Sequence, residues 1–550
     1  MYRKFLKRIM LYTKKYRVYL ILSLLSYVVG IGLTLVAPVL VGKSIDLILG
    51  EGQVDFLGIY KILITLSVMI IAGSFFQWIA YVCTNKLTYK TVRDIRSDIF
   101  EKINRVPLKY IDSIPHGDLI SRIINDVDAI SDGLLQTLMQ LFSGVITIIG
   151  TFAFMIYVNP IITAVVVVLT PLSIFIAMFI SKKSFIFFKN QSDMQGKMTA
   201  FISEMFSSQK IIKSFSYEDE SFNKFKKMNS ELYSVGVKSQ FYSSLANPGT
   251  RFVNSIIYTA VGIIGSYMAV VNGSMTIGAI ASFLSYANQY TKPFNEITGV
   301  VTQIQSAFAG AKRVFEVLDE YEEKDTEGAL EINDVKGHVT LENVSFAYNP
   351  SIKIIDNLSL NVEPGKKVAI TGPTGSGKTT IINLLMRFYD VDEGVIKIDG
   401  IPIKNIKIDS LRKLYGMVLQ DTWLYSASIK ENIAFGNDSV TDEEIILAAK
   451  RANAHNFIKR MEKGYDTVIS ENASNISIGQ KQLLCIARVM LLDPPMQILD
   501  EATSNIDTMT EQKIQMAFNE MMKGRTSFIV AHRLSTIKNA DIRVEISRNK

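Results

Sequence analysis

The sequence predicts an all-α membrane bundle of six long transmembrane helices, followed by an α/β domain built around a phosphate-binding loop. Three observations support this fold class. Apolar stretches of about 20 residues, long enough to cross a bilayer, recur through the first half of the chain. The second half has the pattern of short strands and helices, with a glycine-rich loop between a strand and a helix. A chain of 550 residues also exceeds what one hydrophobic core usually organises, so at least two domains are expected.

Composition and charge agree with a membrane bundle joined to a soluble domain. Apolar residues make up 48% of the chain, yet 20% of the residues are charged. The formal net charge is +7, and a group of basic residues directly precedes the first apolar stretch. These residues are Arg3, Lys4, Lys7, Arg8, Lys14, Lys15 and Arg17. This position favours anchoring at the cytosolic membrane face over nucleic-acid binding. Cys83 and Cys485 are far apart and predict buried, reduced thiols.

The six predicted spans are apolar windows near residues 19–41, 59–82, 138–158, 161–180, 252–271 and 277–301. Short connections alternate with two long polar ones, 85–136 and 181–246, which carry Lys and Arg beside the spans. By the positive-inside rule, the long connections, the N-terminus and everything after the sixth span lie in the cytosol. The protein is therefore expected to be a multi-pass protein of the cell membrane.

The long connections are expected to be helical. Val92, Ile95, Ile99 and Ile103 keep a helical apolar spacing, with few breaking residues between them. A hairpin of about 50 to 60 helical residues, folded once, reaches roughly 40 Å from the membrane at 1.5 Å per residue. Such a hairpin is long enough to touch a soluble domain.

The sixth span contains two charged residues, Lys292 and Glu296, at an i,i+4 spacing around Pro293. Counted from Thr276, they lie roughly 24 and 30 Å below the outer surface, near the inner edge of the hydrocarbon core. At this depth both can extend to the interface, so a structural pair is favoured. The alternative is that Glu296 faces the cavity and selects cationic cargo.

After a polar linker at 319–336, the residues 366–386 (KKVAITGPTGSGKTTIINLLM) read as a strand, a glycine loop and a helix. Gly372, Gly375 and Gly377 allow backbone N–H groups to turn toward phosphates at the helix N-terminus. Lys378 would reach the β- and γ-phosphates, and Thr379 would hold Mg²⁺. Farther along, the apolar strand MQILDE ends in Asp500 and Glu501, with Asp500 directed toward Mg²⁺ and Glu501 beside the attacking water.

Between these two motifs, NISIGQKQLLCIARVMLLDPP (475–495) resembles the signature segment of ABC ATPases. The hairpin segments at 107–130 and 211–225 look like the two intracellular loops of ABC exporters, whose tips dock on the ATPase. The chain is therefore identified as similar to an ABC exporter half-transporter, with a transmembrane domain at 1–318 and an α/β P-loop ABC ATPase domain at 337–550. Soluble ABC ATPases of repair or translation are excluded by the spans.

The resemblance implies a set of site residues. The catalytic residues are Glu501 and the switch histidine His532. The nucleotide-binding residues are Tyr348, which stacks on adenine, and Gly372, Thr374, Gly375, Ser376, Gly377, Lys378, Thr379, Thr380, Gln420, Ser477, Gly479, Gln480, Asp500 and Asp507. The metal-binding residues are Thr379, Gln420 and Asp500. The implied cofactors are ATP and Mg²⁺.

The implied activity is ATP-driven export of an amphipathic drug-like compound, lipid or peptide by alternating access. An ATP-gated channel, or a regulatory and weakly active subunit, would share every motif. The resemblance also implies a second half-transporter as partner, because each ATP site is completed by the signature of the other chain. A heterodimer is favoured over a homodimer, since Ile476 replaces the usual leucine and Ile478 occupies a place often filled by glycine or a polar residue.

Two features of the ATPase half are expected to weaken it. Family members continue beyond the switch histidine with further elements, so the resemblance implies a truncated C-terminus. Here Ile542, Val544 and Ile546 alternate with polar residues and predict only a short, half-exposed strand. Gln497 lies in a strand that should be continuously apolar, and an unpaired amide there costs about 1 to 3 kcal/mol.

Overall fold

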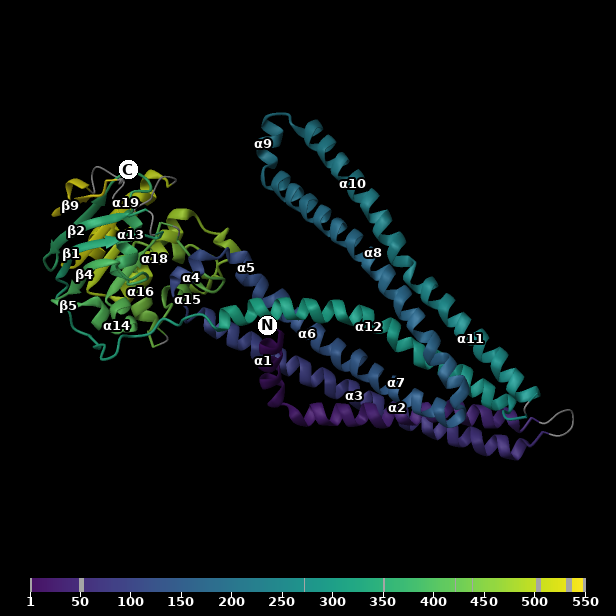
Figure 1. Ribbon diagram of the computed structural model, residues 1–550. Coiled ribbons are helices and arrows are strands. Elements are labelled where there is room, and N and C mark those ends of the chain that lie inside the picture. Colours follow the sequence, from purple (N-terminus) through teal and green to yellow (C-terminus); the bar gives the residue numbers. More distant parts are fainter. Residues whose placement is uncertain are drawn as a thin grey trace. The chain divides into compact units, whose positions relative to one another are not determined.

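The computed structural model describes residues 2–48, 54–271, 273–349, 352–420, 422–437, 439–500, 506–530 and 537–547 (Figure 1). The chain forms two compact units. The first unit comprises Met1–Asn104 and Pro115–Glu320, and the second comprises Arg105–Ile114 and Tyr321–Lys550. A short piece of the first predicted hairpin therefore belongs to the same unit as the C-terminal half.

The first unit is all-helical. Its helices are α1 (Tyr2–Lys14), α2 (Arg17–Asp46), α3 (Phe56–Ile103), α5 (His116–Ser121), α6 (Val127–Gln136), α7 (Ser143–Val158), α8 (Pro160–Ser207), α9 (Gln209–Ser214), α10 (Glu218–Ser244), α11 (Ala246–Val270) and α12 (Ile277–Leu318). Two π-helical turns, Arg122–Asp126 and Thr137–Phe142, connect α5 to α6 and α6 to α7.

The helices begin where the sequence supplies capping side chains. Asn159 accepts hydrogen bonds from the backbone N–H groups of Ile161 and Ile162, and Pro160 occupies the first helical position of α8. Thr276 caps α12 by accepting from the N–H of Ala279. These caps fix the tight turns at which the chain reverses between successive spans.

The prediction of six spans is confirmed for four. Within the described residues, the helical segments long and apolar enough to cross a membrane are Arg17–Asp46, Phe56–Ile103, His116–Val158 and Glu218–Val270. The fourth predicted span begins with the shorter apolar segment Pro160–Leu172 of α8. The sixth lies in α12, where Lys292 and Glu296 interrupt the apolar sequence. Six transmembrane helices therefore remain a prediction.

The long connections are helical, as predicted. Helices α3 and α8 each contain 48 residues. At 1.5 Å per residue each is roughly 70 Å long, more than twice the thickness of a hydrocarbon core. Both helices therefore extend well beyond the membrane as arms of the two hairpins.

Polar contacts as well as apolar packing hold α12 against its neighbours. The Tyr286 hydroxyl donates to the carbonyl of Leu35 at 2.5 Å, and the Ser282 hydroxyl donates to the carbonyl of Pro38 at 2.8 Å. A Cβ on Gly278 would lie 1.9 Å from the carbonyl oxygen of Gly42, so α2 and α12 approach too closely for any larger residue there. The predicted Lys292–Glu296 pair is present, with a nitrogen–oxygen distance of 3.8 Å.

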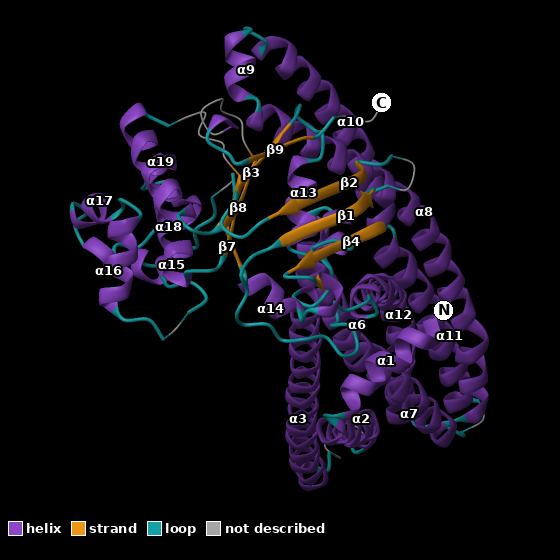
Figure 2. Cartoon of the chain, turned by 90° about the vertical axis from the view of Figure 1, so that its left-hand side faces the viewer, coloured by secondary structure: helices purple, strands orange, loops and turns teal. Residues whose placement is uncertain are grey.

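The second unit contains two sheets (Figure 2). The antiparallel sheet has the order β2-β1-β4-β5, and the parallel sheet has the order β6-β7-β8-β3-β9. The strands are β1 (Val339–Phe346), β2 (Ile355–Val362), β3 (Lys367–Thr371), β4 (Glu393–Ile398), β5 (Ile401–Pro402), β6 (Tyr415–Val418), β7 (Met496–Asp500), β8 (Thr526–Val530) and β9 (Ile542–Glu545).

The helices of this unit are α4 (Leu108–Ser113), α13 (Lys378–Leu385), α14 (Ile408–Lys413), α15 (Ile429–Ile433), α16 (Asp442–Arg451), α17 (His455–Lys459), α18 (Ile478–Leu492) and α19 (Thr508–Met522). Two hydrophobic clusters form its core. One packs the two sheets and α13 together, and the other packs α15 to α19 around the far side of β7 and β8. Cys485 lies buried in the second cluster, as predicted.

Strand β9 is the short, half-exposed strand that the alternation predicted. It pairs in parallel with β3 at the edge of the sheet, with Val544 buried and Arg543 and Glu545 exposed. The Gln497 prediction is also confirmed in part. Its side chain is fully buried in β7, its amide nitrogen donates to the carbonyl of Pro494 at 3.3 Å, and its amide oxygen has no partner among the described residues.

Candidate functional site

The candidate site is built on the loop between β3 and α13. Gly372 and Gly377 have φ angles of +150° and +100°. A Cβ on Gly372 would lie 2.4 Å from the carbonyl oxygen of Ile546, and one on Gly377 would lie 2.5 Å from Ile354 Cγ2. Both the backbone conformation and the space therefore require glycine, as in a loop whose N–H groups turn toward an anion.

The predicted phosphate-binding lysine lies over this loop. Lys378 is only 7% exposed, and its Nζ donates to the carbonyls of Gly372 at 2.9 Å and Pro373 at 3.0 Å. Ser376 is 3% exposed, and its hydroxyl is among the buried polar atoms without a partner in the described structure. A buried cation beside an unpartnered buried hydroxyl suits a phosphate group, which can accept hydrogen bonds from both.

A cavity of about 330 Å³ opens beside the loop. It brings together predicted residues from four separate parts of the sequence. These are Tyr348, Thr374, Gly375, Gly377, Lys378, Thr379, Thr380, Gln420 and Asp500. The cavity is also lined by Ile354 and Val530, which the sequence did not single out because isolated apolar residues carry no chemical signal.

Tyr348 is placed to stack on a flat ring. Its own ring meets those of Phe346 and Tyr389 edge to face, with centroids 4.9 and 5.0 Å away, and its hydroxyl accepts from the Asn383 side chain at 3.1 Å. These contacts fix the ring orientation while 45% of the residue stays exposed. An adenine base could therefore lie on the open face.

The three predicted metal-binding residues line the same cavity. Asp500 ends β7 and is 6% exposed, Thr379 lies in the first turn of α13, and Gln420 follows β6. Their carboxylate, hydroxyl and amide oxygens are the hard ligands that Mg²⁺ prefers. The donor set therefore fits the predicted ion.

The two predicted catalytic residues, Glu501 and His532, lie outside the described residues. The strands that precede them are described and lie side by side. Asp500 at the end of β7 is in register with Val530 at the end of β8, and both residues line the cavity.

The signature residues lie at the N-terminus of α18 and do not line this cavity. Ser477 and Gln480 form a capping box, in which the Ser477 N–H donates to the Gln480 side chain at 2.9 Å and the Gln480 N–H donates to the Ser477 hydroxyl at 3.2 Å. A Cβ on Gly479 would lie 2.4 Å from Thr510 Cγ2. The local sequence thus positions an exposed helix N-terminus packed against α19.

Asp507 caps α19. It accepts a hydrogen bond from the Thr510 N–H at 2.9 Å, and this bond lowers the pKa of its carboxyl group. The residue also does not line the cavity. Within this chain, Ser477, Gln480 and Asp507 therefore have helix-capping roles.

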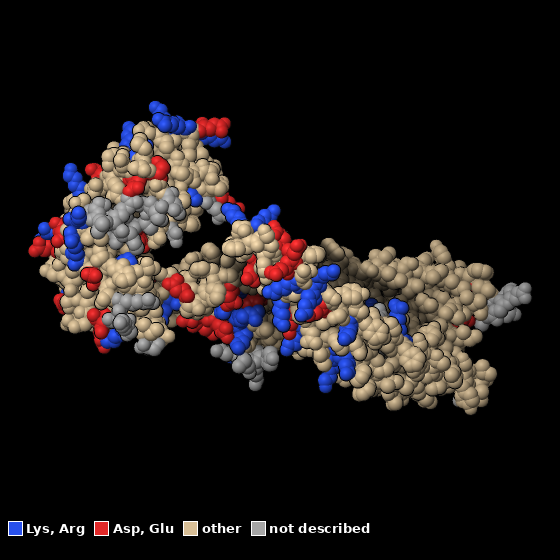
Figure 3. All heavy atoms as spheres, turned by 90° about the horizontal axis from the view of Figure 1, so that it is seen from above, with Lys and Arg blue, Asp and Glu red and all other residues tan. Residues whose placement is uncertain are grey.

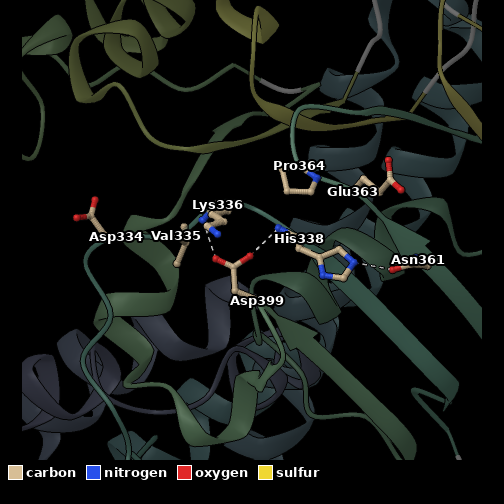
Figure 4. Close-up of a pocket in the computed structure, with 8 residues that line it drawn as sticks. All are labelled: Asp334, Val335, Lys336, His338, Asn361, Glu363, Pro364 and Asp399. Atoms are coloured by element: carbon tan, nitrogen blue, oxygen red, sulfur yellow. Dashed lines mark hydrogen bonds between the residues drawn. The ribbon is translucent and has the colours of Figure 1, made fainter.

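A second groove of this unit, of about 810 Å³, lies where the linker meets β1 (Figure 4). Asp399 accepts from the backbone N–H groups of Lys336 at 2.6 Å and His338 at 2.8 Å, and the His338 ring is hydrogen bonded to Asn361 at 2.7 Å. None of the predicted site residues lines this groove. Its polar groups fix the linker to the antiparallel sheet.

The tip of the first hairpin is part of the second unit and packs on its core, in agreement with the docking that the resemblance implies. Leu108 of α4 packs against the core cluster around β1 and α13, and the carbonyl of Arg105 accepts from the N–H of Glu323 at 2.8 Å. Tyr389 donates a 2.6 Å hydrogen bond to Asp112. The sequence had given no signal for Tyr389, which lies 277 positions from its partner.

Comparison with known proteins identifies the family of both parts of the chain. Residues 20–294 match the family model of the ABC transporter transmembrane region, and residues 355–504 match the ABC transporter model. The chain is 39% identical over 499 residues to the fatty acid ABC transporter ATP-binding/permease protein of Mycobacterium bovis, covering 91% of this chain and 79% of that protein.

Two further relatives have different names. The ATP-dependent lipid A-core flippase of Syntrophus aciditrophicus is 35% identical, with 91% of this chain and 83% of the relative aligned. A putative multidrug export ATP-binding/permease protein of Staphylococcus aureus is 34% identical, with 98% of this chain and 94% of the relative aligned. The similarity extends through both the helical and the α/β parts.

Proposed function

This chain belongs to the ABC transporter family as an exporter half-transporter with fused membrane and ATPase parts, and we propose that it exports an amphipathic substrate by alternating access. The observation that carries the proposal is the cavity beside Lys378, which gathers the predicted nucleotide residues in the same chain as four membrane-spanning segments. ATP binding and hydrolysis there would drive the helical bundle between inward- and outward-open states.

The chain's own residues have distinct roles in this proposal. Lys378 and the N–H groups of the loop bind the β- and γ-phosphates, and Tyr348 orients the base. Thr379, Gln420 and Asp500 would hold Mg²⁺, which neutralises phosphate charge when bound. Glu501 acts as the general base on the attacking water, and His532 contacts the γ-phosphate.

The substrate class is supported by what the relatives are named for: a fatty acid, lipid A-core and multiple drugs. All three kinds of molecule combine apolar and polar parts. We propose that this chain likewise moves an amphipathic lipid, drug-like compound or peptide. Long apolar helices of the first unit provide the matching environment.

We place the N-terminus, both hairpins and the ATPase unit in the cytosol. Lys and Arg lie at the N-terminus and along the long connections, which by the positive-inside rule stay on the cytosolic side. In Figure 3 the right-hand part of the first unit, where α2 ends in Figure 1, shows few charged side chains, as a lipid-facing surface should.

The working unit in this proposal is a dimer, and a heterodimer is favoured. The signature residues of this chain lie apart from its own nucleotide cavity, so they would serve a partner's site. In a heterodimer the substitutions Ile476 and Ile478 would affect only one of the two sites. Full, substrate-stimulated ATPase activity of the purified chain as a homodimer would exclude the heterodimer.

The alternative is an ATP-gated channel or a weakly active regulatory subunit, which would retain the same nucleotide cavity. Reconstitution of the chain in liposomes, alone and with a candidate partner, tests the proposal. Movement of a fluorescent lipid or dye that depends on continued ATP hydrolysis is expected. Equilibration of the dye after ATP binding alone would favour the channel.

A further inference from the structure

A polar cavity of about 590 Å³ lies between α11 and α12, which pack side by side in the first unit (Figure 1). Arg251, Asn254 and Tyr258 line it from one face of α11, and Asn288 and Lys292 line it from α12. A polar cavity between two largely apolar helices is unusual, because polar groups in a membrane domain are unfavourable unless they bind something. Binding of a ligand would account for these polar groups.

The charge in this cavity has one sign. Arg251 and Lys292 are both cationic, and none of the described residues that line the cavity is acidic. Lys292 has Glu296 one helical turn away, at 3.8 Å. Within the described residues, Arg251 has no carboxylate within 4 Å, so its charge is not compensated by an ion pair. The cavity is therefore electropositive.

The cavity also offers hydrogen-bonding capacity that the protein does not use. The side-chain oxygen of Asn254 is buried and has no partner among the described residues. This oxygen accepts hydrogen bonds, so it can pair with a hydroxyl or N–H group that neighbours the charged oxygens of a ligand. Thr291, by contrast, is satisfied within α12 by donating to the carbonyls of Ala287 and Asn288.

The depth of the two cations matches the inner membrane interface. Helices α11 and α12 are joined by a short connection at 271–276. From that connection, Arg251 lies roughly 29 Å along α11 and Lys292 roughly 23 Å along α12, at 1.5 Å per residue. With the connection at the outer face, both side chains lie near the inner boundary of a hydrocarbon core about 30 Å thick.

We propose that this cavity binds the anionic headgroup, a carboxylate or phosphate, of a lipid-like substrate from the inner leaflet. Arg251 and Lys292 would bind the charged oxygens, while the apolar parts of α11 and α12 toward the outer face contact the acyl chain. This inference rests on the proposed function and narrows its substrate to anionic amphiphiles. It also opposes the view that Glu296 selects cationic cargo, because Glu296 does not line the cavity.

Binding of radiolabelled oleate to the full chain in nanodiscs tests this proposal, with oleyl alcohol and oleylamine as neutral and cationic ligands of the same length. Oleate is expected to bind at least about tenfold more tightly than the alcohol, as for charge-assisted hydrogen bonds. Arg251→Gln combined with Lys292→Gln should remove this preference. A thermal unfolding midpoint equal to that of the wild type would show that the variant is folded.

A matched control is present on the same helix. Lys312 pairs with Glu316 at 3.8 Å with the same i,i+4 geometry as Lys292 and Glu296, but does not line the cavity. Lys312→Gln should leave oleate binding unchanged. Equal loss in both variants would indicate a general effect of surface charge and would overturn the proposal.

Four other outcomes are decisive. Equal affinity for oleate and oleyl alcohol would assign the cavity to apolar binding and contradict the proposal. Competition by millimolar inorganic phosphate or acetate as strong as that by oleate would assign it to a free anion. Transport of neutral or cationic amphiphiles without oleate binding would refute this inference and leave the proposed export function standing. Oleate binding without transport of any amphiphile would contradict the proposed export function and leave the anion-binding cavity standing.

Discussion

The Tyr389 hydroxyl donates a 2.6 Å hydrogen bond to the Asp112 carboxylate, and this bond ties the tip of the first hairpin to the ATPase unit. Burial, reinforced by Asp112, raises the pKa of Tyr389, so the phenol remains a neutral donor. Its ring also packs edge to face on Phe346 and on Tyr348, which lines the nucleotide cavity. One aromatic cluster thus contacts both the hairpin tip and the nucleotide site.

Tyr389→Phe should weaken the coupling between the hairpin tip and the nucleotide site. The ring contacts remain and the hydrogen bond is lost, at a cost of about 1 kcal/mol because Asp112 is exposed. We expect the stimulation of ATP hydrolysis by substrate to fall about fivefold, with basal hydrolysis nearly unchanged. Tyr321→Phe is the control, since Tyr321 lies nearby but is 64% exposed. Equal loss of stimulation in both variants would contradict this role.

Lys378→Ala should weaken nucleotide binding itself. The lysine supplies the buried cation of the glycine loop, and its loss removes charge-assisted hydrogen bonds to phosphate. Equilibrium titration with a fluorescent ATP analogue should show an affinity reduced by about tenfold or more. Lys366→Ala, a more exposed lysine paired with Asp541, should bind as the wild type does. Unchanged affinity in the Lys378 variant would remove it from the site.

Glu501→Gln should separate binding from turnover. If Glu501 is the general base, ATP turnover falls by about 10²-fold or more, while ATP affinity is retained. Single-turnover hydrolysis and nucleotide titration on the same preparation measure the two effects. Turnover near the wild-type rate would exclude Glu501 as the base, and loss of ATP affinity would instead indicate a structural role.

Gln497 offers a test of stability. Its buried amide oxygen has no partner in the described structure, and Gly416 leaves the space that it occupies. Gln497→Met should raise the unfolding free energy by about 1 kcal/mol, because removing the unpaired oxygen outweighs one 3.3 Å hydrogen bond. Gln497→Glu should lower it by several kcal/mol through a buried charge. Thermal unfolding of the full chain would reveal both shifts, and destabilisation by Met would contradict this account.

Much of the fold could be predicted because its signals are local. The glycine loop needs residues at fixed offsets, and the alternation around Val544 was sufficient to predict β9. The helical hairpins followed from an apolar spacing that continues beyond the spans. The number of spans was less certain, because the charges of α12 interrupt its apolar sequence and hydropathy cannot distinguish a cavity-lining helix from a peripheral one.

The remaining features depend on contacts between distant residues. Asp112 and Tyr389 are ordinary residues in sequence, and only folding brings them together. Ile354 and Val530 contribute shape and no chemistry to the nucleotide cavity. Arg251 and Lys292 come from different helices, so neither predicts an electropositive cavity by itself. The resemblance to ABC ATPases predicted that Ser477 and Asp507 bind nucleotide. Their helix-capping roles became apparent only in the structure.

Accumulation of a fluorescent amphiphile in inverted membrane vesicles that contain this chain, alone or with a candidate partner, tests the central claim most directly. With ATP, the fluorophore should rise inside the vesicles above its external concentration, and Lys378→Ala should abolish this rise. Such uphill movement requires a pump. If the fluorophore only equilibrates across the membrane, or if accumulation is the same without ATP, the chain is not an ATP-driven exporter.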